Sequence, residues 1–87
     1  MKRKNLTLGQ AMRCAARAAV RHRRVYYVLP AETEDTWTYW PFRGQSGIAF
    51  RVDGDGEMAL QVERGSWVSV GAYVEGSEFE LRLETTI

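Results

Sequence analysis

The spacing of apolar residues changes once along this chain, near residue 25, and this change constrains the fold most. Up to Arg24 the apolar residues recur at helical intervals, and from Val25 onward they alternate with other residues as in β-strands. A chain of 87 residues can build one modest hydrophobic core. The sequence therefore predicts one α+β domain over residues 1–87, with an N-terminal amphipathic helix packed on an antiparallel sheet.

The predicted helix begins at a capping box. Thr7 and Gln10 have the spacing at which each side chain binds the backbone N–H of the other, which predicts a helix over about 8–24. At about 100° per residue its apolar residues form one stripe, and because most of them are alanines the helix can lie close to a sheet. The stripe holds Leu8, Ala11, Met12, Ala15, Ala16 and Ala19, and the opposite side holds Arg13, Arg17, Arg21 and Arg24.

Turn signals divide the rest of the chain into six predicted strands. These cover about residues 25–29, 36–42, 48–52, 57–63, 67–74 and 78–86. The clearest turn is Asp53-Gly54-Asp55-Gly56, because Asp and Gly tolerate the positive φ angles of tight hairpins. Since each strand follows the previous one after a short turn, we expect a bent antiparallel meander of five to six strands, or a small barrel if the sheet closes.

Alternation also predicts which face of the sheet each side chain occupies. The strands at 25–29, 36–42 and 67–74 are apolar on both faces. One helix covers one face, so an aromatic surface should remain on the other face for a partner. The candidate partner-binding residues are Trp37, Tyr39, Trp40, Trp67 and Tyr73.

Charge is divided unevenly between the two parts of the chain. Residues 1–24 hold eight lysines and arginines and no acid, a formal charge of +8, whereas residues 25–87 hold four arginines and eleven acids, a formal charge of −7. The arginine side of the helix could stay solvated, contact a phosphate backbone or dock on an acidic protein. We do not expect bases to stack on the sheet, because its negative charge repels phosphate.

Few residues are available for catalysis. Cys14 is the one cysteine and His22 the one histidine, which excludes an internal disulfide and a zinc cluster of these two residue types. The carboxylates at 53–57 lie on too short a loop for an EF-hand calcium site, and the chain has no glycine-rich phosphate loop. We therefore expect a non-enzymatic protein with no metal and no cofactor.

The basic N-terminal segment shares its composition with organelle transit peptides. It lacks their serines, however, and it carries the capping residues of a folded helix. Arg13, Arg17 and Arg21 also interrupt any apolar segment of a secretory signal. We expect a cytoplasmic protein that does not enter a membrane.

These patterns favour a small protein-binding module that uses the aromatic sheet surface, the arginine side of the helix, or both, to dock on a protein or nucleoprotein complex. By analogy alone, small proteins with one acidic and one basic part are found among phage and mobile-element inhibitors of host machinery, including anti-defence proteins. The alternative is a nucleic-acid-binding accessory protein that uses the arginine side of the helix. A third arrangement is a homodimer that buries the aromatic surface against a second copy.

Overall fold

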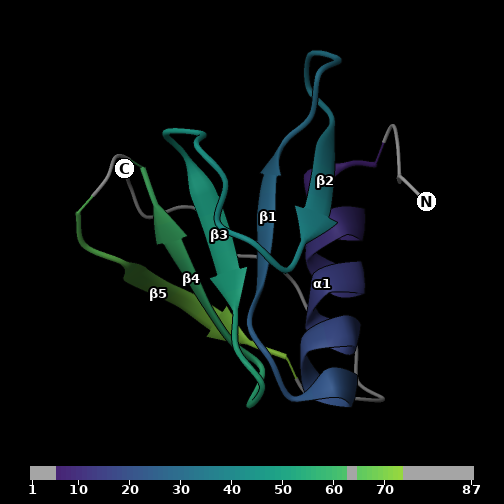
Figure 1. The fold of residues 1–87 in the computed structure, drawn as a ribbon, viewed down its shortest axis with the longest axis vertical. Helices are drawn as coiled ribbons and strands as arrows, with labels where there is room; N and C mark the ends of the chain where they lie inside the picture. The colour runs from purple at the N-terminus through teal and green to yellow at the C-terminus, as the bar shows by residue number, and fades with distance from the viewer. Residues whose placement is uncertain (1–5, 63–64, 74–87) are drawn as a thin grey trace.

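A computed structural model describes residues 6–62 and 65–73 and shows one helix packed on an antiparallel sheet (Figure 1). This confirms the predicted α+β class. The elements are α1 (Leu8–His22), β1 (Tyr26–Pro30), β2 (Trp37–Trp40), β3 (Ala49–Val52), β4 (Glu57–Gln61) and β5 (Val68–Ala72). The sixth predicted strand, at 78–86, lies outside the described residues, as do residues 63 and 74 at the ends of two other predicted strands.

The capping box forms as predicted. The hydroxyl of Thr7 accepts the backbone N–H of Gln10 at 3.1 Å, and the side-chain oxygen of Gln10 accepts the backbone N–H of Thr7 at 2.9 Å. The helix ends at His22, two residues before the expected end, because Arg23 adopts the left-handed conformation with φ of 55°. Its backbone N–H still binds the carbonyl of Ala19 and so closes the last turn.

The strand order in the sheet is β2-β1-β3-β4-β5, with every neighbouring pair antiparallel. The expectation of a simple meander is therefore wrong at its start, because β1 lies between β2 and β3. A strand that is apolar on both faces gains most from a central position, and Val28 of β1 is fully buried. Over the described residues the sheet is open, with β2 and β5 at its edges, so the barrel is not supported.

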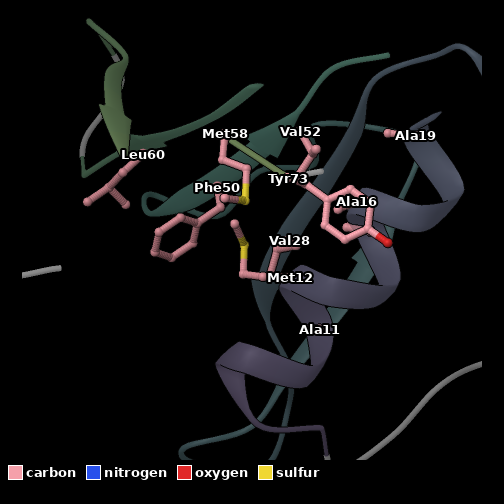
Figure 2. Packing of buried hydrophobic residues seen from close by; sticks show 11 residues of the cluster. Ala11, Met12, Ala16, Ala19, Val28, Phe50, Val52, Met58, Leu60 and Tyr73 are labelled. Atoms are coloured by element: carbon pink, nitrogen blue, oxygen red, sulfur yellow. The ribbon is translucent and has the colours of Figure 1, made fainter. Parts of the chain in front are cut away.

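The core lies between α1 and the face of the sheet formed by β1, β2 and β3, all of which contact the helix. Met12 of α1 and Met58 of β4 extend toward each other beside Phe50 (Figure 2). The helix residues buried there are Ala11, Met12, Ala15, Ala16 and Ala19. The predicted stripe is thus confirmed, with Leu8 partly buried at its end.

Two sets of hydrogen bonds hold the hairpin turn between β3 and β4. One is made by the side chain of Asp53 and the other by the backbone of Tyr73, directly after β5. The carboxylate of Asp53 accepts the backbone N–H groups of Asp55 and Glu57 at 2.9 and 3.1 Å. The carbonyl of Gly56 accepts the backbone N–H of Tyr73 at 2.8 Å. Gly56 has φ of 88°, and a Cβ atom there would lie 2.5 Å from the carbonyl oxygen of Tyr73. Glycine is therefore required at this position by both conformation and space.

Removal of the helix cap should lower stability. We expect Thr7→Ala to reduce the free energy of unfolding by about 1 kcal/mol, because one N-terminal N–H of the helix loses its acceptor. Thr7→Ser keeps the hydroxyl and is the matched control. Urea unfolding followed by circular dichroism measures both. Equal stability of the two variants would contradict the capping role.

Gly56→Ala should lower the free energy of unfolding by on the order of 2–3 kcal/mol, because alanine is strained at this φ and its methyl group meets the carbonyl of Tyr73. Gly47→Ala is the control, since its Cβ atom would have no neighbour within 4 Å. That variant should stay within about 0.5 kcal/mol of the parent. Urea unfolding measures both variants. Similar free energies of unfolding for the two alanine variants would show that the turn tolerates a side chain.

Candidate functional site

The strand register separates the side chains of the sheet into two faces. Val28 is paired with Tyr39 and with Phe50, so these residues share the face that α1 covers. Trp37 and Tyr39 are half-buried there and pack against the core cluster. Tyr73 is 8% exposed and belongs to the cluster itself. Three of the five predicted aromatic residues thus lie on the helix side, and we build the candidate surface on the other two.

The sheet face turned away from α1 is called the outer face here. One row of paired residues crosses it from edge to edge, and each residue comes from a different strand. In strand order the row is Trp40, Tyr27, Arg51, Ala59 and Ser69. The small Ala59 leaves room above the sheet for larger neighbouring side chains.

At the β2 end of the outer face, Trp40 and Phe42 form an exposed aromatic pair. Trp40 is 54% exposed and Phe42 is 58% exposed, and both are among the most exposed large apolar residues of the described chain. Their ring centroids lie 6.0 Å apart with the planes inclined by 57°. Pro41 between them ends β2 and cannot continue a strand ladder. The two rings are therefore presented together at the end of an edge strand.

Trp67 gathers two arginines on the same outer face. The guanidinium carbon of Arg51 lies 4.4 Å from the centroid of the Trp67 ring, and that of Arg43 lies 5.9 Å from it. Both distances are within the range of cation–π attraction. The ring of Tyr27 lies 6.4 Å from the Trp67 ring. The Trp67 indole thus lies close to two cations and a phenol, near the middle of the row.

Arg43 is fixed in this cluster by hydrogen bonds. Its Nε and Nη2 atoms donate to the side-chain oxygen of Gln61 at 3.1 and 2.7 Å, and its Nη1 donates to the carbonyl of Ser46 at 2.9 Å. Gln61 in turn donates to the carbonyl of Gly65 at 3.0 Å. Alternation places Gln61 on a polar face, yet it is 5% exposed. These bonds satisfy a buried polar side chain and hold the 41–48 connection against β4.

Phe42, Arg43 and Arg51 are absent from the residues predicted from the sequence. Arg51 alternates with the buried residues Phe50 and Val52, so it lies on the face away from the core. Its proximity to Trp67 could not be predicted from the sequence, because Trp67 directly precedes β5, and β5 is not adjacent to β3 in the sheet. The pairing of Tyr27 with Arg51 would have indicated this cluster, but only the strand register of the structure gives that pairing.

The described strands contain few charged residues. Among the residues of β1 to β5, Glu57 is the one acid, and it stands at the start of β4. The other described acids lie in the turns at 32–35 and 53–55. The described strands therefore carry one arginine, Arg51, and one acid, Glu57.

The arginine side of α1 faces away from the sheet. Arg13, Arg17, Arg21 and Arg24 are all exposed. Within the described part of the chain, Arg17, Arg21 and Arg24 have no acidic partner. Since α1 packs on the opposite side of the sheet from Trp40 and Trp67, the helix and the outer face are separate surfaces (Figure 1).

Residues 6–62 and 65–73 contain no group of three or more His, Cys, Asp or Glu side chains that could hold a metal ion. Cys14 is half-buried and not in a disulfide. Within the same residues, no helix has the length and hydropathy needed to cross a bilayer.

Comparisons of this chain with protein families, with curated proteins and with solved structures found no match.

Proposed function

We propose that this protein is a non-enzymatic binding module that docks on another protein through the outer face of its sheet. The observation that supports this most is the exposed pair of Trp40 and Phe42 beside the Trp67 cluster. Aromatic and arginine side chains supply most of the binding energy at protein interfaces. Here both kinds stand on one face that the helix leaves uncovered.

The aromatic pair alone is too small to form a complete protein interface. Two half-exposed rings present on the order of 200 Å² of apolar surface. Each partner in a standard protein interface buries roughly 800 Å². Trp40 and Phe42 are therefore suited to be the anchor, with Tyr27, Leu29 and Thr38 providing neighbouring surface on the same face.

Geometry favours a protein over bases stacked on the outer face. Nucleic-acid platforms offer flat, open rings within a basic groove. The guanidinium of Arg51 already lies over the ring of Trp67, and the rings of Trp40 and Phe42 are inclined by 57° to each other. Several donors of Arg43 are bound to Gln61 and Ser46. Among residues 6–62 and 65–73, the outer face thus offers neither a common stacking plane nor the row of cations that phosphate contacts require.

A second copy of the chain is one possible protein partner, since a two-fold contact would bury the same aromatic pair on both copies. The narrower expectation of a phage or mobile-element inhibitor that docks on host machinery stays a prediction, because no described residue bears on it.

The second candidate function, nucleic-acid binding, rests on the helix. Arg17 and Arg21 lie one turn apart, are exposed and have no acidic partner among the described residues, and the helix itself contains no acid. Such a surface attracts any polyanion. It lacks side chains that read base edges, so this binding would be independent of base sequence.

Docking through the outer face predicts that Trp40→Ser/Phe42→Ser weakens partner binding at least tenfold, because it removes the apolar anchor. Both rings are half exposed, so the free energy of unfolding should change by less than about 1 kcal/mol. The partner is captured from the native host with and without nuclease, identified by mass spectrometry and titrated in pure form. Light scattering over a concentration series detects a second copy as the partner.

Val68→Ser is the matched control, because Val68 is 57% exposed but lies on β5 at the other edge of the sheet. It should leave partner binding unchanged. If the double variant binds the partner as tightly as the parent, the outer face is not the docking surface.

Nucleic-acid binding by the helix should be weak and should disappear above about 0.2 M salt, because it depends on phosphate contacts alone. Fluorescence anisotropy with one duplex and its scrambled version measures it. Arg17→Glu/Arg21→Glu should abolish it, whereas Arg51→Met, on the other side of the molecule, should not. Tight binding that prefers one sequence at high salt would contradict this account.

A further inference from the structure

Three aromatic rings adjoin one another at the C-terminal end of α1. His22 is the last residue of the helix, and its ring centroid lies 6.4 Å from that of Tyr26, with the planes inclined by 35°. The ring centroid of Tyr26 in turn lies 6.2 Å from that of Tyr39. Both tyrosines are half-buried and pack against the core cluster, whereas His22 is exposed. The outermost ring thus rests beside rings held by the core and stays accessible to solvent.

Two exposed arginines lie close to this ring on the helix. Arg17 and Arg21 are one turn apart on the same side of α1, about 6 Å apart along its axis. At about 100° per residue, Ala18 lies between Arg21 and His22 around the helix, and its methyl group is small. Neither arginine has an acidic partner within the described part of the chain, and α1 contains no acid. One short stretch of surface therefore combines two positive charges with an exposed ring.

This combination matches single-stranded nucleic acid better than a duplex or an acidic protein. Proteins that bind single strands place phosphates on cations and stack bases on aromatic rings nearby. The bases of a duplex are already stacked on one another, so a duplex would contact the arginines through its phosphates alone. An acidic protein segment likewise needs only the arginines. The exposed ring of His22 is thus the feature that distinguishes the single strand from the other ligands.

We propose that the C-terminal part of α1 binds single-stranded nucleic acid, with one base stacked on His22 and the adjoining phosphates on Arg17 and Arg21. This rests on the second candidate function, nucleic-acid binding by the helix, and names the ligand and its base contact. Every base has a flat π-face, so the binding stays independent of base sequence. Neither contact involves the 2′ position of the sugar, and DNA and RNA strands therefore bind alike.

The hairpin turn between β3 and β4 sets the direction of the strand. A Cβ atom on Gly54 would lie 3.3 Å from the Cα atom and from the carbonyl carbon of Arg23, so this turn adjoins the end of the helix. The turn carries the carboxylates of Asp53 and Asp55. Carboxylates repel phosphates that lie within a Debye length, about 10 Å at 0.1 M salt. The nucleic acid therefore extends back along α1 toward Arg17, away from the turn.

The test uses the complete chain and fluorescence anisotropy with labelled oligo-dT of about fifteen nucleotides. Oligo-rU and a duplex of the same length are the comparison ligands. His22→Ala should weaken binding of both single strands at least about fivefold, because it removes the stacking ring. The same variant should change the duplex affinity less than about twofold. His22→Phe keeps a flat ring and is the matched control, which should restore most of the lost affinity.

Two further variants and one spectroscopic signal locate the ligand. Arg17→Met/Arg21→Met should weaken binding of single strands and duplex alike, because both use phosphate contacts. Trp40→Ser/Phe42→Ser removes the exposed rings on the other side of the sheet and should leave the oligo-dT affinity unchanged. In the parent protein, the NMR signals of the His22 ring C–H groups should move upfield with oligo-dT. Inorganic tripolyphosphate, which carries charge without a base, should not produce that upfield shift.

Equal loss of single-strand and duplex affinity in His22→Ala would overturn the stacked base, as would equal losses in His22→Ala and His22→Phe. A loss of oligo-dT binding in Trp40→Ser/Phe42→Ser would place the ligand on the outer face and would also overturn it.

The same titrations separate this inference from the second candidate function. If Arg17→Met/Arg21→Met weakens binding of both ligands while His22→Ala weakens neither, the stacked base is overturned and backbone binding by the helix stands. If neither ligand binds at about 0.05 M salt, both are overturned.

Discussion

In the described part of the chain a single helix, α1, covers one face of the sheet, and the arrangement of the other face follows from that limit. The alanine stripe lets α1 lie close to β1, β2 and β3, so the large apolar groups of the core come mainly from the strands. Met12 is the one long side chain that the stripe contributes to the buried cluster. Apolar residues on the opposite face must then be covered by side chains of the sheet and its loops, or by a partner.

The cover on the outer face is built from an indole and two guanidinium groups. Trp67 receives Arg51 and Arg43, and the hydrogen bonds of Arg43 bring the 41–48 connection to Gln61 of β4. These contacts join segments that are distant in sequence, and they satisfy a polar group that is almost fully buried. They do not extend over Trp40 and Phe42, which stay half exposed. The Trp67 cluster thus lies next to the Trp40 and Phe42 surface that we propose binds a partner.

Charge is spread unevenly over residues 25–62 and 65–73 of the fold. The acids of the described residues gather mainly in the two turns, whereas the strands carry Arg51 and a single acid, Glu57. The formal charge of −7 for residues 25–87 therefore does not describe the charge along the described strands. Local charge near the contact decides recognition, because distant exposed charges are screened by salt.

The sequence by itself determined the helix, its cap and its buried stripe, because these depend on local periodicity and on neighbours a few residues apart. It also identified the tight turn at Asp53–Gly56. Only the tertiary structure decided that β1 is central, that Trp37 and Tyr39 face the helix while Trp40 does not, and that Arg51 meets Trp67. Alternation tells which residues share a face, but it does not tell which face the helix will cover. Strand order and pairing depend on burial across the whole sheet. A local sequence pattern carries no information about that burial.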